Sequence, residues 1–326
     1  DNSIHTCSDN NNIMGEKVFI NEVGLRDGLQ NQPNPVSTAA KLDMGQALLN
    51  AGVRHLEAVA FVHPKAVPQM ADAVDVLAGL APMLSQHAGV EVSALVPNMK
   101  GYQRAIEHGV NSVAVVLSST DTFNLRNLNM TLQQAKETCQ QVIAQANKDN
   151  IRVRAYVSGA CACPYDGTTP VEVVHQLAAD MLGYGADEIS IGDTIGAGNP
   201  QQINDILGPL VQQFGSDRFN LHLHDTRGQA LAMAWAGITQ GIRRFDSSIG
   251  GLGGCPFAPG ASGNVATEDL VYMLEQAGFD TGIDIHALRS AVSAAELATG
   301  QPLGGRFLQW MKSQEQREQQ KQSPCI

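Results

Sequence analysis

The sequence predicts a (β/α)8 TIM barrel with additional C-terminal helices. Short runs of β-branched and other apolar residues alternate with longer segments whose apolar residues recur every three or four positions. Eight such strand–helix units in about 250 residues are typical of this fold. The predicted strands are Lys17–Val23, His55–Val62, Glu91–Val96, Ser112–Ser118, Arg152–Ser158, Glu188–Asp193, Phe219–Asp225 and Arg243–Ile249.

The segments between the strands carry the end signals of helices. Ser37, Thr131 and Thr169 are residue types that cap helix N-termini. Glycine marks three of the C-terminal ends, at Gly52, Gly109 and Gly185. The predicted barrel helices are Ala39–Ala51, Met70–Leu80, Gly101–Glu107, Leu132–Lys148, Pro170–Gly183, Pro200–Phe214 and Gly228–Gly237, and Leu270–Ala277 and His286–Leu297 supply the last barrel helix and added C-terminal helices.

The alternative fold, a doubly wound sheet, needs a Gly-x-Gly-x-x-Gly turn after an early strand. The stretch 24–28 lacks that spacing, and the Gly-rich stretch 250–254 comes too late in the chain. No Pro- or Ser-rich linker divides the sequence. We therefore expect one catalytic domain at 16–300, after a disordered or processed segment at 1–15 and before a polar tail at 301–326.

Composition excludes several classes of function. The chain of 326 residues is 43% hydrophobic and 16% charged, with a net charge of −11, which suits a compact enzyme. No basic stripe is present to bind nucleic acid, and no apolar run approaches the roughly 20 residues of a membrane span. Six cysteines without Cys-x-x-Cys spacing indicate reduced thiols. We expect a cytoplasmic protein in a bacterium, or a mitochondrial-matrix protein in a eukaryote, and favour the cytoplasm.

The sequence Leu-His-Leu-His-Asp at 221–225 suggests half of a metal site. Side chains two apart on a strand share a face, so His222 and His224 project together. The strand breaks directly afterwards, which places the pair at the catalytic end of a barrel. The alternative is a pair of histidines satisfied by hydrogen bonds in a polar barrel core.

Other polar residues follow the predicted strands and would share the same rim. Asp27 and the amide oxygen of Asn264 could complete a mixed oxygen and nitrogen site, which suits Mg²⁺ or Mn²⁺. Arg26 could bind a carboxylate or carbonyl oxygen with its guanidinium fork. The alternatives are a turn role for Asp27 before Gly28 and a surface ion pair for Arg26.

Cys255 lies in the Gly-rich stretch 250–264, where the backbone can approach a ligand and the loop can close. A thiol there could act as an acid or base. The alternative is a small, packed and inert cysteine. Cys161 and Cys163 are expected to be packing residues or to take part in incidental redox chemistry.

Five stretches form a specific set of motifs: Glu22–Asn31 (EVGLRDGLQN), Val67–Met70 (VPQM), Gly192–Gly196 (GDTIG), His222–Thr226 (HLHDT) and the Cys255 loop from Gly251 to Asp269. Together they resemble the 3-hydroxy-3-methylglutaryl-CoA lyases of the DRE-TIM metallolyase superfamily, and the resemblance extends from Val18 to about Leu297. Related synthases share the Arg-Asp and His-x-His elements without the cysteine loop.

The resemblance implies cleavage of this acyl-CoA thioester into acetyl-CoA and acetoacetate. It implies metal ligation by Asp27, His222, His224 and Asn264. It also implies catalytic roles for Arg26 as the enolate-stabilising group, Cys255 as the catalytic thiol, Glu57 and Asp193 as supporting acids, and His222, with substrate binding by Arg26 and Gln30. We further expect a homodimer.

Three positions depart from the family pattern. Ala60 and His63 stand where the family usually has Ser, and Pro33 occupies a position that is usually polar or charged. These changes could alter the acyl pocket or the contacts with CoA. The alternative functions are therefore a lyase for longer 3-hydroxy-3-acylglutaryl-CoA thioesters such as the isohexenyl form, a Claisen-type synthase, and a non-catalytic binding barrel.

Overall fold

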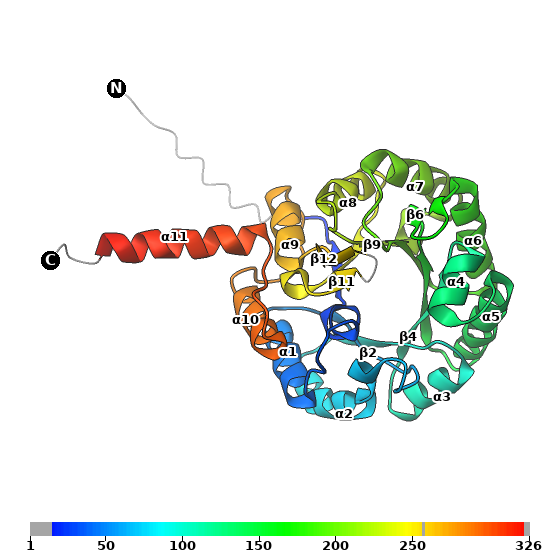
Figure 1. Ribbon diagram of the computed structural model, residues 1–326, viewed down its shortest axis with the longest axis horizontal. Coiled ribbons are helices and arrows are strands. Elements are labelled where there is room, and N and C mark those ends of the chain that lie inside the picture. The colour runs from blue at the N-terminus through cyan, green and yellow to red at the C-terminus, as the bar shows by residue number, and fades with distance from the viewer. Residues whose placement is uncertain (1–14, 256–257, 323–326) are drawn as a thin grey trace, which may run out of the picture.

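The computed structural model describes residues 15–255 and 258–322, and eight parallel strands close into a barrel (Figure 1). The predicted TIM barrel is confirmed, and all eight predicted strands are present. Around the barrel lie β1 (Phe19–Glu22), β10 (Arg244–Ser247), β9 (Phe219–Leu223), β8 (Glu188–Asp193), β5 (Arg152–Ser158), β4 (Ser112–Ser118), β3 (Glu91–Leu95) and β2 (His55–Ala60), which pairs again with β1.

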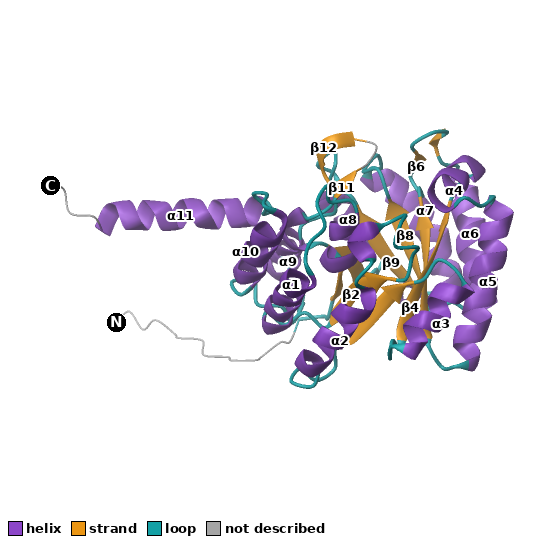
Figure 2. Cartoon of the chain, turned by 60° about the horizontal axis from the view of Figure 1, so that its bottom comes forward, coloured by secondary structure: helices purple, strands orange, loops and turns teal. Residues whose placement is uncertain are grey.

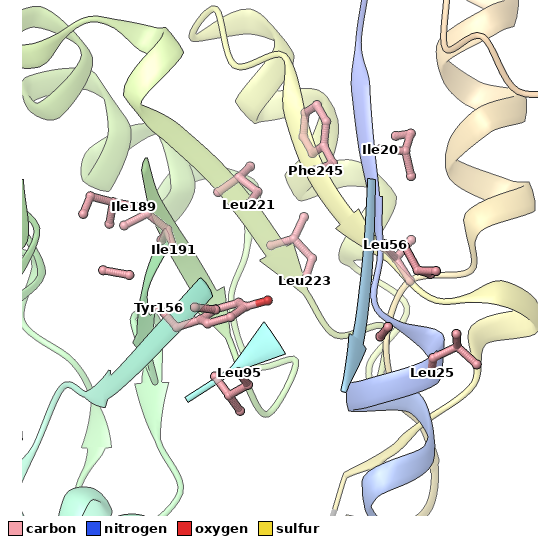
Figure 3. Close-up of a cluster of buried hydrophobic side chains, with 14 of the residues drawn as sticks. Ile20, Leu25, Leu56, Leu95, Tyr156, Ile189, Ile191, Leu221, Leu223 and Phe245 are labelled. Atoms are coloured by element: carbon pink, nitrogen blue, oxygen red, sulfur yellow. The ribbon is translucent and has the colours of Figure 1, made fainter. Parts of the chain in front are cut away.

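Along strand β9, successive side chains point alternately to the outside and to the inside of the barrel wall. Leu221 faces outward, and a Cβ added to Gly237 of α8 would lie 2.5 Å from its Cδ1. Figure 3 shows Leu221 and Leu223 on β9, with Tyr156 of β5 reaching across the lumen. His222, between the two leucines, faces the interior, where its ring lies edge-on to Tyr156 with centroids 5.5 Å apart. This confirms the orientation predicted from the two-residue period.

A ring of helices covers the strands, and helix bounds follow the predicted segments closely. The barrel helices are α1 (Thr38–Asn50), α2 (Ala73–Leu84), α3 (Met99–Glu107), α5 (Leu132–Lys148), α6 (Val171–Tyr184), α7 (Pro200–Phe214), α8 (Ala230–Thr239) and α9 (Thr267–Gln276), and α10 (Leu288–Thr299) packs on α1. Apolar residues recurring every three or four positions place one buried face of each helix on the barrel.

Two of the three predicted N-caps are confirmed. The Ser37 hydroxyl accepts the N–H of Ala40, and Thr131 forms a capping box with Gln134. The prediction for Thr169 was wrong, because Pro170 is the N-cap of α6. The Thr169 hydroxyl instead donates to the carbonyl of Gly159 at 2.6 Å, a tertiary contact that outcompetes the local one.

Several short elements that sequence periodicity did not predict lie at the carboxyl end of the strands. Two small hairpins stand at this rim (Figure 2). They are β6 (Ala162–Cys163) with β7 (Gly167–Thr168) and β11 (Gly254–Cys255) with β12 (Ala258–Ser262). The helix α4 (Asp121–Leu128), the π-helical turn η1 (Gly24–Gly28) and the 3-10 turn η4 (Ile249–Gly251) complete the rim. Each element is too short to show a period in sequence.

The C-terminal residues form α11 (Arg306–Gln322), which extends away from the barrel (Figure 1). Asp269 of α9 anchors its start, because its carboxylate accepts the N–H groups of Arg306 and Phe307 at 3.0 and 2.8 Å. Within the described residues, every helix is too short or too polar to cross a membrane.

Candidate active site

A cavity of about 240 Å³ opens at the carboxyl end of the barrel strands. Its polar wall includes Arg26, Asp27 and Gln30 from the segment that follows β1, and His222 and His224 at the end of β9. Residues from the end of β3, from α4 and from the segments that follow β2 and β3 form an apolar wall, which includes Val62, Val67, Leu95, Pro97, Phe123 and Leu128. The cavity therefore combines groups that can bind a charged centre with a surface that can cover a hydrocarbon group.

Asp27, His222 and His224 converge as the sequence predicted. The two histidine Nε2 atoms lie 3.3 Å apart. The Asp27 Oδ2 atom is 3.7 Å from Nε2 of His222 and 3.8 Å from Nε2 of His224. The three ligand atoms all lie within 4.8 Å of one another, and all three side chains are largely buried. This is the spacing of groups that can bind one ion together.

The alternative interpretation, two histidines satisfied by hydrogen bonds, does not fit His224. Its Nδ1 is buried and has no hydrogen-bond partner among the described residues. Its Nε2 faces another imidazole and a carboxylate. Leaving Nε2 buried among these groups is costly unless a bound group completes its interactions. The donor set of two nitrogens and a carboxylate oxygen thus fits a divalent cation.

Asn264 lies beside this cluster. Its backbone forms an isolated antiparallel bridge with His224, and its Nδ2 donates to Asp27 Oδ2 at 2.7 Å. The amide is therefore within reach of the same centre. Rotation of the amide by 180° would present Oδ1 there instead of Nδ2, and ligation through that oxygen stays a prediction.

The π-helical turn η1 places Arg26 and Asp27 next to each other at the cavity wall. The Arg26 Nε donates to Glu57 Oε1 at 2.6 Å, and its Nη1 donates to Asp27 Oδ1 at 2.8 Å. A second bond from Nη1 reaches Gln30 Oε1 at 3.2 Å. Arg26 is only 5% exposed, so the surface ion pair considered for it is excluded.

Comparison with known proteins agrees with this geometry. The family model described as HMGL-like matches residues 17–294, which include every site residue named above. The chain belongs to the HMGL-like family. It is 43% identical to hydroxymethylglutaryl-CoA lyase of Bacillus subtilis over 298 residues, covering 91% of this chain and 98% of that protein.

Two further relatives bear on the substrate. The chain is 40% identical over 293 residues to a Pseudomonas aeruginosa protein named 3-hydroxy-3-isohexenylglutaryl-CoA/hydroxymethylglutaryl-CoA lyase, covering 90% of this chain and 96% of that protein. The structure of an HMG-CoA lyase from Acinetobacter baumannii in complex with coenzyme A and 3-methylmalate superposes with a TM-score of 0.84. It is 35% identical and covers 90% of this chain and 94% of that chain.

In this HMGL-like protein, the electrostatic environment favours the ligand-competent forms of Asp27 and His224. Burial alone would raise the pKa of Asp27, but Arg26 and the two histidines outweigh it and lower that pKa to about 2. Burial and the neighbouring His222 lower the pKa of His224 to about 4. Asp27 is thus a carboxylate and His224 a neutral imidazole at pH 7, and metals bind these forms.

His222 differs from His224 in its surroundings. Burial alone would lower its pKa, yet the hydrogen bond to Asp246 and the charge of Asp27 raise it above its ordinary value. The Nδ1 of His222 lies 2.8 Å from Asp246 Oδ2. Asp246 was not predicted as a site residue, because nothing local marks an aspartate in the short strand β10 as the neighbour of a histidine on another strand.

Glu57 and Asp193 are buried, and both oxygens of each carboxylate accept a hydrogen bond. Glu57 accepts Arg26 Nε on one oxygen and the hydroxyl of Tyr156 at 2.8 Å on the other. The oxygens of Asp193 accept the N–H groups of Ala197 and Gly198, both at 3.0 Å. These contacts suit residues that position their neighbours, and the catalytic roles expected for the two acids stay predictions.

The backbone of Cys255 belongs to β11, and the neighbouring Gly254 lines the cavity. The side chain of Cys255 lies outside the described part of the structure, so its catalytic role also stays a prediction. Cys161 and Cys163 are free and buried, as expected for packing residues. The Cys163 sulfur lies 3.2 Å from the Thr120 hydroxyl.

The three positions that depart from the family pattern are absent from the described lining of the cavity. Ala60 is buried within the barrel wall. His63 and Pro33 are exposed, and the Nδ1 of His63 accepts the N–H of Lys65 at 3.2 Å. Direct contact of these side chains with the acyl group is therefore not needed to explain the shape of the pocket.

Proposed function

We propose that this protein is a divalent-metal-dependent lyase that cleaves 3-hydroxy-3-methylglutaryl-CoA into acetyl-CoA and acetoacetate. The observation that carries the proposal is the convergence of Asp27, His222 and His224 with the Arg26 guanidinium in one cavity of an HMGL-like chain. The names of the relatives, and the coenzyme A bound in one of them, support an acyl-CoA thioester as the substrate.

The reaction sets the requirements of the site. The C3 hydroxyl loses its proton, the bond between C2 and C3 breaks, and C3 becomes the ketone carbon of acetoacetate. The electron pair stays on C2 as the enolate of acetyl-CoA, and a proton delivered to C2 completes the product. The site must therefore accept one proton, stabilise a negative oxygen and donate one proton.

We assign the cation to Asp27, His222 and His224, with Asn264 as the fourth ligand, and we propose Mg²⁺ or Mn²⁺ because both favour oxygen-containing ligand sets. The chemistry such a cation supplies is Lewis acidity, which lowers the pKa of a substrate hydroxyl.

The polar wall provides the remaining groups. Arg26 reaches the cavity with a guanidinium held by Glu57, so it can stabilise the enolate oxygen without reorganising. Gln30, which is bonded to Arg26, lies at the same wall and would contact the substrate. Asp27 lines the cavity, and its carboxylate can accept the hydroxyl proton. We propose the Cys255 thiol as the donor to C2, because its backbone neighbour lines the cavity.

The direct test is incubation of the purified protein with this thioester and Mg²⁺, with acetyl-CoA measured by chromatography. We expect release of acetyl-CoA that stops on addition of a chelator and returns with excess Mg²⁺ or Mn²⁺. Failure to release acetyl-CoA in the presence of either cation would overturn the proposal. A condensation that requires an α-keto acid would instead favour the synthase.

A second substrate is favoured by the apolar wall. Leu95, Phe123 and Leu128 lie opposite the charged groups and could cover a 3-alkyl substituent longer than methyl. The relative from Pseudomonas aeruginosa is named for both substrates. A panel of 3-hydroxyglutaryl-CoA thioesters with methyl and isohexenyl groups at C3 tests this extension. Turnover of the methyl compound alone would restrict the specificity.

We also propose that the chain forms a homodimer. An exposed aromatic surface, in which Tyr272 of α9 stacks on Phe307 of α11 with ring centroids 4.4 Å apart, supports an interface. Trp310 extends this surface and is 57% exposed. Light scattering of the purified protein should give twice the mass of one chain. A monomeric mass at micromolar concentration would contradict the proposal.

We propose that the protein lies in the cytoplasm of a bacterium, or in the mitochondrial matrix of a eukaryote. The buried free thiols of Cys139, Cys161 and Cys163 support a reducing compartment. Fractionation followed by immunoblotting of the native protein tests this, and recovery in a periplasmic or membrane fraction would contradict it.

A further inference from the structure

Asp246 lies directly below the proposed cation site. It is on β10, which pairs with β9 so that Asp246 stands opposite His222 in the register. Its Oδ2 is 2.8 Å from Nδ1 of His222, and the residue is only 2% exposed. The carboxylate therefore contacts the ring nitrogen of His222 that does not face Asp27 and His224.

The carboxylate of Asp246 is itself held in place from several sides. Arg154 Nη2 donates to Oδ1 at 2.7 Å, and Asn21 Nδ2 donates to the same oxygen at 3.0 Å. The Tyr156 hydroxyl lies 3.1 Å from Oδ2. Because Arg154 and Asn21 both donate to Oδ1, the carboxylate cannot move away from His222 without breaking these bonds, and it fixes the direction in which Nδ1 of His222 points.

The two histidines differ in this respect. The Nδ1 of His224 has no hydrogen-bond partner among the described residues, whereas the Nδ1 of His222 faces a fixed carboxylate. A carboxylate accepts a proton and cannot donate one when ionised, so Nδ1 of His222 must be the protonated nitrogen. The Nε2 lone pair of His222 then points at the cation site.

We infer that Asp246 is the positioning residue for the cation site, because it fixes the tautomer and the orientation of His222. The inference rests on the proposed function, since the cation is part of it. Replacing a carboxylate that contacts a metal-binding histidine in this way typically lowers the metal affinity by about 10- to 100-fold.

The same layer also supports Arg26. The Tyr156 hydroxyl lies between Asp246 Oδ2 and Glu57 Oε2, and Glu57 in turn accepts Arg26 Nε. Asp246 and Glu57 thus form one buried layer that orients a cation ligand on one side and the enolate-stabilising guanidinium on the other. Loss of Asp246 should act first on cation binding, because its direct contact is with His222.

The test compares Asp246→Asn with Glu188→Gln, measuring the Kd for Mn²⁺ by calorimetry. Both changes remove one buried carboxylate that binds Arg154, since Arg154 Nε donates to Glu188 Oε1 at 2.8 Å. No contact between Glu188 and His222 occurs in the described structure. We expect Asp246→Asn to raise the Kd by about 10- to 100-fold and Glu188→Gln to leave it within about twofold. Equal shifts in the two variants, or an unchanged Kd in Asp246→Asn, would overturn the inference.

A second measurement reads the protonation of His222 in the native protein, and a variant is needed only to assign the signal. Long-range ¹H–¹⁵N spectra of the Mg²⁺-loaded protein report the tautomer of each histidine, and His222→Asn identifies the signal. We expect a proton on Nδ1 of His222, and a proton on Nε2 would overturn the inference. The native protein could bind Mn²⁺ more tightly than Asp246→Asn and yet fail to cleave the thioester. That result would contradict the proposed function and support the role of Asp246.

Discussion

The barrel holds two clusters of charged side chains, one at each end of the strands, and they differ in how their charges are compensated. Near the amino ends, Arg152 contacts Glu91 and Glu188 at 3.1 and 2.9 Å, and Arg154 contacts Glu188 at 2.8 Å. Near the carboxyl ends, the ligand atoms of Asp27, His222 and His224 converge on one another within 4.8 Å, and no cationic side chain lies between them in the described structure.

This difference distinguishes a structural cluster from a candidate site. Buried charges that have opposite charges and hydrogen bonds as partners need nothing further, whereas ligand atoms converging on a shared point require a bound group. Counting charged residues in the lumen would have ranked the two ends alike. The pairing of individual atoms separates them, and substitutions at the two ends should therefore have different consequences.

The largest effect is expected from removing ligands at the carboxyl end. Asp27→Ala and His222→Ala each leave an incomplete coordination shell, so both Mn²⁺ affinity and turnover should fall by more than the roughly 10- to 100-fold typical of outer-shell partners. Calorimetry and the acetyl-CoA assay measure the two losses. His175→Ala is the control, because its Nε2 contacts the Ile206 carbonyl on the outer helices at 2.9 Å. Native Mn²⁺ affinity in either variant would remove that residue from the ligand set.

The next largest effect is expected for Cys255, and it should distinguish the role of its thiol in turnover from the role of the cation ligands in binding. Cys255→Ser keeps the size of the side chain and should retain Mg²⁺ and acyl-CoA binding, while turnover falls by about 10²–10⁴-fold, as for loss of an acid or base. Cys161→Ser and Cys163→Ser should leave the rate nearly unchanged, since both thiols are buried packing groups. A rate near that of the native protein in Cys255→Ser would return Cys255 to a packing role.

A third effect concerns Glu22, which ties the turn carrying Asp27 to the base of the Cys255 loop. Its carboxylate accepts the N–H groups of Gly24 and Ile249, both at 2.9 Å, and the Thr267 hydroxyl at 2.6 Å. Burial raises the pKa of Glu22 to about 7 despite these hydrogen bonds. The folded state thus binds more protons than the unfolded state between pH 4.5 and 7, so this contribution is present below pH 4.5 and is lost as the pH rises through 7.

Urea denaturation between pH 5 and pH 8 measures this contribution. The free energy of unfolding of the native protein should fall over that range by on the order of 2–3 kcal/mol more than that of Glu22→Gln, which cannot ionise. Parallel pH profiles for the two proteins would show that Glu22 has an ordinary pKa in the folded state.

The smallest effect on function is expected at the amino end. Glu188→Gln weakens the contacts with Arg152 and Arg154, and should reduce the free energy of unfolding by about 1–3 kcal/mol, as for hydrogen bonds to charged groups. The rate of acetyl-CoA release should stay within about twofold of the native rate. A loss of activity without a loss of stability would mean that the two clusters are functionally coupled.

Much of the fold could be predicted from the sequence because strand and helix periods are local properties. All eight barrel strands and the helices between them follow the predicted segments, and Ser37 and Thr131 cap their helices through contacts with nearby residues. Thr169 failed as a cap because its hydroxyl finds a partner on another segment, Gly159. The rim elements α4 and η1 were missed because they are too short to show a period.

The sequence by itself determined the barrel and the residues at its rim. A two-residue period puts His222 and His224 on one face, and the break after β9 puts them at the catalytic end. The tertiary structure decided which side chains support them. Asp246 meets His222 through the register of two strands, and Tyr156 meets Glu57 across the lumen. These contacts join residues far apart in the chain, and only closure of the barrel brings them within hydrogen-bonding distance.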